Sequence, residues 1–225
     1  MEAGKTPIAD LDKLTNAGAD MRHLDQFGIA NVANSVNVKR WGSVPTLDKP
    51  SIAEHSYLVT MYCRYLGAVI APDMTDAEKL LMTDLALVHD LPEVKTGDMA
   101  TPIKRYLESM FPKGESPLDL IEERICAPYA DLREQTRGTC LAVIVKLADI
   151  LEALHFITNN GKGEVTRVIA RERQKAFNAY IQIGMDGWPN LQWMKAQGVL
   201  EALMHDIPEQ IDFEEIIKDA PRQEI

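Results

Sequence analysis

Four side chains of types that bind metal ions lie in or beside segments that are otherwise apolar. They are His55, the adjacent pair His89 and Asp90, and Asp149. A buried imidazole or carboxylate is costly unless a partner compensates for it, and a divalent cation is among the strongest partners available. Nitrogen and oxygen donors together suit a transition ion such as Mn²⁺, Co²⁺, Ni²⁺, Fe²⁺ or Zn²⁺ better than Ca²⁺, which prefers oxygen. We therefore predict one divalent transition ion per chain at these four residues.

Glu93 follows Asp90 by three residues, and its position leaves two roles open. It could coordinate the ion, or it could stay outside and move a proton of the attacking water or the leaving oxygen. The other histidines His23, His155 and His205 are left out of the set. A lone histidine is more often a hydrogen-bonded structural residue than a metal ligand.

The segments that carry these residues have the end signals of helices. Ser51 with Glu54, and Thr75 with Glu78, form capping boxes that open helices over 51–70 and 76–90. Pro92 ends the second helix, because proline removes a backbone donor and crowds the preceding turn. Thr-Pro at 101–102 and Ser-Pro at 116–117 each place a cap residue before a proline and open further helices.

The downstream half has the same character. A long helix is predicted over 136–158, closed by Asn-Asn-Gly at 159–161, and another over 164–180, with shorter helical pieces around 188–190 and from 204 to 217. Strand patterns, internal repeats and low-complexity linkers are lacking from the sequence. We predict an all-α fold, with 1–225 as a single compact helical domain.

One face of the long helix carries a polar stripe. In LAVIVKLADILEALHF the polar residues Lys146, Asp149 and Glu152 are spaced three apart on an otherwise apolar helix. The stripe indicates either a functional site or a narrow strip facing solvent. In the second case Lys146 and Asp149 form an ion pair that stabilises by only about 0.2–0.5 kcal/mol.

Composition excludes several classes of protein. The 225 residues are 46% hydrophobic and carry 34 acidic against 24 basic residues, a formal charge of −10. This charge disfavours binding along a nucleic-acid polymer. The sequence has no apolar signal core and no uninterrupted membrane span, so we expect a cytoplasmic protein. Cys63, Cys126 and Cys140 are widely spaced and are expected to be reduced.

Five blocks of sequence together resemble the HD-domain phosphohydrolases. In order they are Arg-Trp, Glu-His-Ser, His-Asp with Glu three residues later, Thr-Gly-Asp with Thr-Pro beyond, and Lys-x-x-Asp. They lie in RWGSVPTLDKPSIAEHS, LALVHDLPEVKTGDMATPIKRY and KLADILEAL. The resemblance is to the YfbR-like 5′-deoxynucleotidase branch, with related phage dNTP triphosphohydrolases. It implies that 1–225 is one HD domain with a motif-bearing core at about 38–155.

The resemblance also implies roles for individual residues. His55, His89, Asp90 and Asp149 match the metal ligands, and Glu93 matches a catalytic carboxylate that acts on water. Arg40 matches a catalytic cation that orients the phosphate. The other substrate-binding positions of the family correspond here to Trp41, Asp98, Thr101 and, as a secondary assignment, Lys146. The implied reaction is in-line attack of an activated water on phosphorus, with charge on the phosphoryl oxygens balanced by the ion and Arg40.

Simpler interpretations remain open for the substrate-binding residues. Arg40 and Trp41 could be a surface cation packed on an aromatic ring, and Asp98 after Gly97 is ordinary turn chemistry. Thr101 is first of all a helix cap. Ser43 is a departure from the family, because relatives of this branch place an apolar residue there against the base. The small polar side chain weakens any inference about one particular base.

The favoured function is a divalent-metal-dependent phosphohydrolase that converts a deoxynucleoside 5′-monophosphate to deoxynucleoside and phosphate. An alternative is a dNTP triphosphohydrolase, such as a phage dATPase, that releases triphosphate. A second alternative is a catalytically silent nucleotide-binding regulator, which the intact ligand set and Glu93 argue against. The resemblance further implies a bacterial or phage-encoded enzyme that uses Co²⁺, Mn²⁺, Zn²⁺ or a similar ion and forms a homo-oligomer, either a dimer or a hexamer.

Overall fold

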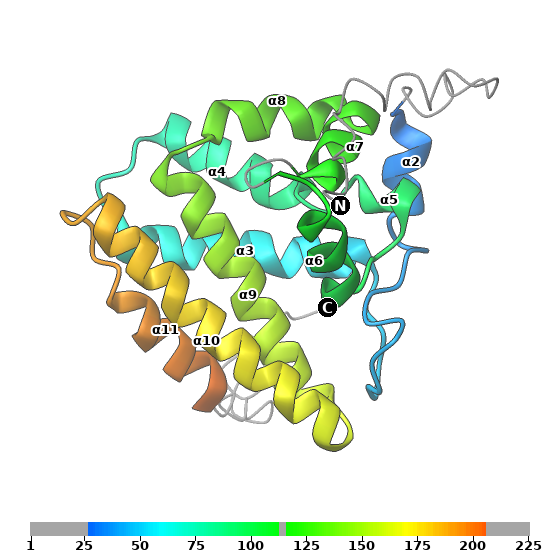
Figure 1. Ribbon diagram of the computed structural model, residues 1–225. Coiled ribbons are helices and arrows are strands. Elements are labelled where there is room, and N and C mark those ends of the chain that lie inside the picture. The colour runs from blue at the N-terminus through cyan, green and yellow to red at the C-terminus, as the bar shows by residue number, and fades with distance from the viewer. Residues whose placement is uncertain (1–26, 113–115, 206–225) are drawn as a thin grey trace, which may run out of the picture.

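The architecture is a bundle of α-helices around one long central helix. A computed structural model describes residues 27–112 and 116–205, and the helices in these ranges are labelled α2 to α11 (Figure 1). The described residues form no strand, only two isolated bridges between Lys39 and Ser51 and between Thr46 and Gly161. The predicted all-α class is confirmed. The single domain over 1–225 stays a prediction, because part of that range lies outside the described residues.

The bounds of the helices follow the end signals in the sequence closely. They are α2 (Ile29–Asn34), α3 (Ile52–Ile70), α4 (Asp76–Val88), α5 (Glu93–Thr96), α6 (Thr101–Ser109), α7 (Pro117–Ile125), α8 (Ala127–Thr136), α9 (Cys140–Asn160), α10 (Gly163–Gly187) and α11 (Lys195–His205). None of these helices combines the length and the apolar character that crossing a membrane requires.

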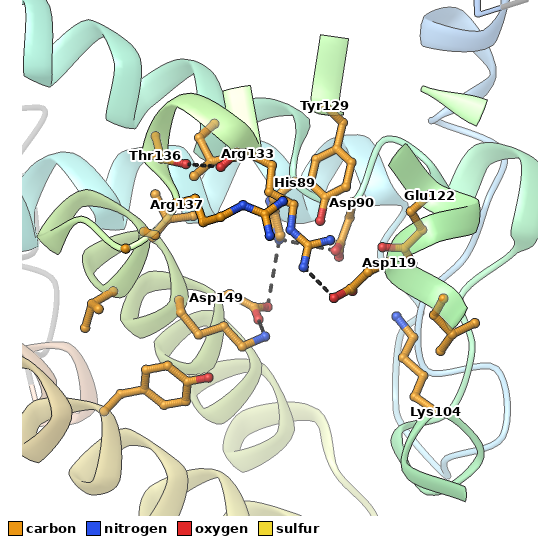
Figure 2. A pocket seen from close by; sticks show the side chains of 18 of the residues that line it. His89, Asp90, Lys104, Asp119, Glu122, Tyr129, Arg133, Thr136, Arg137 and Asp149 are labelled. Atoms are coloured by element: carbon orange, nitrogen blue, oxygen red, sulfur yellow. Dashed lines mark hydrogen bonds and ion pairs between the residues drawn. The ribbon is translucent and has the colours of Figure 1, made fainter. Parts of the chain in front are cut away.

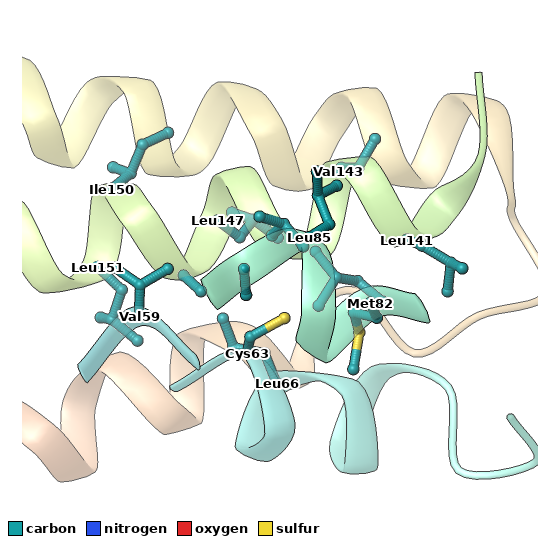
Figure 3. Close-up of a cluster of buried hydrophobic side chains, with 14 of the residues drawn as sticks. Val59, Cys63, Leu66, Met82, Leu85, Leu141, Val143, Leu147, Ile150 and Leu151 are labelled. Atoms are coloured by element: carbon teal, nitrogen blue, oxygen red, sulfur yellow. The ribbon is translucent and has the colours of Figure 1, made fainter. Parts of the chain in front are cut away.

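Helix α9 is the centre of the fold. It packs most extensively against α10 and α3 and also contacts α4, α8 and α11 (Figure 1). Thirteen of its 21 residues are buried, which a helix covered on one side alone would not show. Its apolar side chains interlock with Val59, Cys63 and Leu66 of α3 and with Met82 and Leu85 of α4 (Figure 3). The core therefore holds α3, α4 and α9 in fixed positions relative to one another.

Local capping sets where the chemically interesting residues fall. The Ser51 hydroxyl accepts a hydrogen bond from the backbone N–H of Glu54 at 3.2 Å, and the Glu54 carboxylate accepts one from the backbone N–H of Ser51 at 2.6 Å. This capping box places His55 in the first turn of α3. At the other end of the site, α4 finishes at Val88, so His89 and Asp90 lie in the turn that precedes Pro92.

Three predicted boundaries are wrong. The helix expected over 136–158 begins only at Cys140, because Gly138 adopts a left-handed φ of 69° and separates α8 from α9. Thr101 is the first residue of α6 rather than its cap, since Ala100 occupies the cap position. Helix α10 extends to Gly187, beyond the expected end at 180. Helical structure expected beyond His205 lies outside the described residues, as does His23.

The contact between α10 and the segment before α11 depends on a glycine. The ring of Trp193 is 1% exposed and lies against Gly184, where an added Cβ would meet a ring carbon at 2.3 Å. We expect Gly184→Ala to lower the free energy of unfolding by about 1–3 kcal/mol, because the buried ring must move. Chemical denaturation followed by circular dichroism measures the change.

Gly198→Ala is the matched control for this prediction. Gly198 lies within α11 with nothing within 4 Å of an added Cβ, so the substitution should be neutral or stabilising by up to about 1 kcal/mol. Equal effects of the two substitutions would contradict the packing argument.

Candidate functional site

The four predicted ligands meet at one point between three parts of the chain. His55 comes from α3, His89 and Asp90 from the turn after α4, and Asp149 from the middle of α9. The two Nε2 atoms of the histidines lie 3.2 Å apart. One ligand atom from each of His55, His89 and Asp149 can be chosen so that all three lie within 4.8 Å of one another. Segments that are far apart in sequence thus form one compact cluster.

Asp90 completes the cluster with both of its oxygens. Its Oδ2 lies 3.3 Å from Nε2 of His55, and its Oδ1 lies 3.5 Å from Nε2 of His89. Asp149 contributes Oδ1 at 3.5 Å from His55 and 3.9 Å from His89. His55 is fully buried, and the side chains of the other three are 12–17% exposed. The cluster is therefore largely shielded from water yet reachable from one side.

Hydrogen bonds at the far side of each ring orient both imidazoles. Nδ1 of His89 lies 2.7 Å from the carbonyl oxygen of Ala86, and Nδ1 of His55 lies 2.6 Å from Oε2 of Glu152. A carbonyl and a carboxylate accept, so we assign the ring proton to Nδ1 in both histidines. Both Nε2 atoms then face the carboxylates of Asp90 and Asp149, and a bound ion would take the place of the proton that these carboxylates hold on Nε2 of His55. Such a donor set fits a divalent cation, and the structure supports the predicted metal-binding site.

The electrostatics of the cluster favour positive charge. Burial alone would lower the pKa of His55, but hydrogen bonds with Asp149, Asp90 and Glu152 outweigh it and raise that pKa to about 10. Burial lowers the pKa of His89. For Asp149, burial opposes ionisation, yet Lys146 and the two histidines hold its pKa well below the usual range. The carboxylates are therefore ionised donors.

Glu93 lies beside the cluster between two cations. Lys104 of α6 donates to its Oε1 at 2.7 Å, while Nη1 of Arg40 lies 3.5 Å from its Oε2. That Oε2 is buried and makes no hydrogen bond among the described residues. Burial, together with the charge of Asp90, raises the pKa of Glu93 to about 8, against the opposing effect of the two cations. The free oxygen is able to accept or deliver a proton.

Arg40 and Trp41 do not form a surface pair of a cation packed on an aromatic ring, because each contacts other residues. Arg40 donates to Asp90 and is 12% exposed, so it belongs to the charged cluster. Trp41 instead stacks on Phe156 of α9, with ring centroids 5.7 Å apart and an angle of 19° between planes. The interpretation of Arg40 packed on Trp41 is therefore wrong.

The backbone of Trp41 is held in an uncommon conformation. Its φ is 61°, and its N–H donates to Oδ2 of Asp98 at 2.9 Å. Lys49 donates to the carbonyl oxygens of Trp41 and Gly42 at 2.8 and 3.1 Å. The indole Nε1 is buried and has no hydrogen-bond partner within 27–112 and 116–205. A strained, over-determined backbone with a free donor is typical of a ligand-binding position.

The remaining predicted residues take their places around this centre. Lys146 donates to Oδ2 of Asp149 at 2.6 Å, so the ion pair proposed as an alternative exists. Only the Lys146 end of the stripe faces solvent, because Asp149 and Glu152 are buried. The hydroxyl of Thr101 accepts from Arg173 of α10 at 3.0 Å. Thr101 is thus tied to α10 rather than to the metal cluster.

Sequence reasoning assigned no role to Glu152, Phe156 or Lys49. The signal for Glu152 was present, since a carboxylate in an apolar helix one turn after a predicted ligand is expected to face the same site. Phe156 and Lys49 gave no signal, because stacking and carbonyl contacts depend on how α9 meets the 40–50 loop. The free cysteines Cys63, Cys126 and Cys140 form no disulfide, as predicted.

Glu152 is only 2% exposed and its contact with His55 orients a metal ligand. Partners of this kind typically contribute about 10–100-fold to metal affinity. We expect Glu152→Gln to weaken Zn²⁺ or Mn²⁺ binding by about this factor, measured by isothermal titration calorimetry. The matched control is Glu164→Gln, which removes an exposed carboxylate of α10 and should leave the affinity unchanged. Equal affinity of Glu152→Gln and the native protein would rule out the orienting role.

Comparison with known proteins agrees with this geometry. The family model described as 5′-deoxynucleotidase YfbR-like matches residues 29–163. A dATP triphosphohydrolase of Salmonella phage PMBT28 is 33% identical over 64% of this chain and 73% of its own length. One from Acinetobacter phage SH-Ab 15497 is 27% identical over 86% and 98%. A 5′-deoxynucleotidase of Shewanella oneidensis is 28% identical over 70% and 84%.

A solved structure is similar over most of the chain. It is the HD phosphohydrolase of cyanophage S-2L, bound to dA and one catalytic Zn²⁺ ion, with a TM-score of 0.64 and 27% identity over 87% of this chain and 99% of that one. The fold and the clustered donors of this chain are those of a metal-binding HD domain. The chain therefore belongs to the YfbR-like 5′-deoxynucleotidase family and is an HD-superfamily phosphohydrolase.

Proposed function

We propose that this protein hydrolyses the bond between the α-phosphorus and the 5′-oxygen of a deoxynucleotide. The observation that carries the proposal is the placement of Glu93, whose Oε2 makes no hydrogen bond among the described residues and lies 3.5 Å from Nη1 of Arg40, the residue that donates to Asp90. The names of the relatives support a deoxynucleotide substrate, since both 5′-deoxynucleotidases and dATP triphosphohydrolases are among them.

Each residue around the cluster has a task in this reaction. His55, His89, Asp90 and Asp149 would hold the ion, which supplies Lewis-acid activation when bound. Arg40 is buried and permanently charged, so its guanidinium compensates charge on phosphoryl oxygens. Glu93 exchanges the proton of the attacking water or of the leaving 5′-oxygen. Lys104 holds Glu93 in place through Oε1 and leaves Oε2 available.

The nucleoside is proposed to bind on the Trp41 side of the cluster. Trp41 and Phe156 form a stacked aromatic pair, and the free indole N–H offers a donor to the base or sugar. Asp98 fixes the backbone of Trp41 through Oδ2, which leaves its second oxygen for the deoxyribose. Thr101 and Lys146 are retained as substrate-binding residues, Thr101 at the start of α6 and Lys146 beside Asp149.

The finer assignments of cofactor and assembly also belong to this proposal. The ion is proposed to be Zn²⁺, Co²⁺ or Mn²⁺, and the Zn²⁺ in the S-2L phage structure supports the first. A homo-oligomeric state, dimer or hexamer, and a cytoplasmic location in a bacterium or a phage-infected host are carried over from the family resemblance.

A substrate panel tests the proposed reaction. The protein loaded with Zn²⁺, Co²⁺ or Mn²⁺ is incubated with each dNMP and dNTP, and the products are identified by ion chromatography. We expect a deoxynucleoside together with orthophosphate or triphosphate, and much less product from ribonucleotides. If nucleotides bind but every candidate stays intact, the protein is a silent nucleotide-binding regulator instead.

The role of Glu93 is tested by Glu93→Ala. The variant should keep its metal, measured by elemental analysis, while kcat falls by about 10²-fold or more, the scale for losing an acid–base group. Glu201→Ala, which removes an exposed carboxylate of α11, is the control and should keep native turnover. Loss of the ion from Glu93→Ala would identify Glu93 as a ligand rather than a proton carrier.

A further inference from the structure

The cavity beside the metal cluster extends well beyond it. It has a volume of about 590 Å³, and His89, Asp90 and Asp149 lie on its wall. The rest of its lining comes mainly from α6, α7, α8 and the first half of α9 (Figure 2). A group that needs only the cluster would leave most of this space unfilled.

The cavity and the aromatic pair lie on opposite sides of the cluster. Phe156, which stacks on Trp41, follows Asp149 by seven residues on α9, whereas Ala142 and Val143 of the cavity precede it by seven and six. At the rise of an α-helix these separations are about 9–10 Å in each direction. With the nucleoside at Trp41 and the α-phosphorus at the cluster, further groups of the substrate would extend into the cavity.

Two arginines line the cavity, Arg133 within α8 and Arg137 directly after its last residue. Arg133 is held by Asp119 through Nη2, and its Nη1 lies 3.3 Å from Glu123 but is buried without a hydrogen bond. Arg137 pairs with Glu134 at 2.8 Å and with Glu123 at 3.4 Å. Figure 2 shows both side chains among those that line the cavity, together with His89 and Asp149. One turn of α8 separates them, so both can contact the same anion.

The wall carries both signs of charge, with five carboxylates against four cations, so its arginines rather than a net positive charge would attract an anion. Glu108, Asp119 and Glu122 also line the cavity. Burial, and then the charges of Asp90 and Asp119, raise the pKa of Glu122 despite nearby Lys104, so its negative charge is disfavoured. A phosphate that displaced Asp119 from Arg133 would exchange one anionic partner for another and would satisfy the free Nη1. The wall also carries Lys104 and Lys146.

We propose that Arg133 and Arg137 form a subsite for the terminal phosphates of a deoxynucleoside triphosphate. This inference rests on the proposed hydrolysis at the 5′-oxygen and specifies its substrate. Water attacks the α-phosphorus, the bond to the 5′-oxygen breaks, that oxygen takes a proton, and triphosphate leaves as one unit. The end of helix α8 would then help to distinguish a triphosphate from a monophosphate.

The kinetic experiment compares Arg133→Gln/Arg137→Gln with the native protein. The KM for dNTP hydrolysis should rise by about tenfold or more, the loss expected for charge-assisted contacts, while metal affinity and any dNMP hydrolysis stay unchanged. Arg167→Gln, an exposed arginine of α10, is the control and should leave the KM for dNTP at its native value. A native KM in the double variant would overturn the proposal.

Calorimetry with inorganic tripolyphosphate tests the subsite apart from catalysis. The metal-loaded native protein should bind it, and the double variant should lose at least tenfold in affinity. Asp119→Asn distinguishes anion binding by Arg133 from a structural role of Arg133 in the contact between α7 and α8. The substitution removes the carboxylate that pairs with Arg133 and with it one negative charge. Asp119→Asn should therefore bind tripolyphosphate as tightly as the native protein or more tightly.

The outcomes distinguish the subsite from the proposed function. Weakening in Asp119→Asn equal to that in the double variant would show a structural role and overturn the subsite. If the double variant loses tripolyphosphate binding but the native protein cleaves no nucleotide, the anion subsite stands and the proposed hydrolysis is refuted. If the double variant loses tripolyphosphate binding but keeps the native KM for dNTP, the arginines bind a free anion rather than the substrate, and the proposal is overturned.

Discussion

The site is built around a buried cluster of imidazole nitrogens and carboxylate oxygens that requires a compensating cation. Two imidazole nitrogens face each other at 3.2 Å, with the oxygens of Asp90 and Asp149 directly beside them. Lone pairs and ionised carboxylates at such distances repel one another unless positive charge is shared among them. Arg40 and Lys146 each neutralise one oxygen, and the centre of the cluster is left for an ion. Glu93, Glu152 and Lys104 are positioned by this charge balance.

Helix α9 is fixed in the core and therefore holds several side chains of the site in fixed positions. It supplies Asp149 as a donor, Glu152 as the orienting partner of His55, Lys146 as a counter-charge and Phe156 as the support of Trp41. Its other faces are fixed by contacts with α3, α4 and α10. Because so much of the helix is buried in a close-packed core, these side chains have little freedom to shift. A divalent ion needs donors held to within a few tenths of an ångström, and a helix locked in this way can provide them.

The two sides of the cluster differ in chemical character, and this difference connects the site with substrate choice. On one side lie the stacked rings of Trp41 and Phe156, with a backbone held in a left-handed conformation by Asp98 and Lys49. On the other side lies a cavity with cations and carboxylates on its wall. An amphipathic ligand with an aromatic end and a polyanionic end matches this polarity. Ser43, two residues beyond Trp41, is exposed.

The sequence by itself determined the helical class, the cap positions at Ser51 and Thr75, and which side chains are of types that can bind a metal ion. These features depend on local hydrogen bonding and on residue chemistry. The order and spacing of His55, His89, Asp90 and Asp149 indicated one site, and the structure brings them together. The break at Gly138 was missed because a single left-handed glycine can end a helix or be tolerated within it. Only the tertiary structure decided that Glu152 orients His55, that Trp41 stacks on Phe156 and not on Arg40, and that arginines in and directly after α8 line the cavity. These contacts join segments far apart in the chain, and their geometry follows from how α3, α8 and α9 pack, which no local pattern specifies.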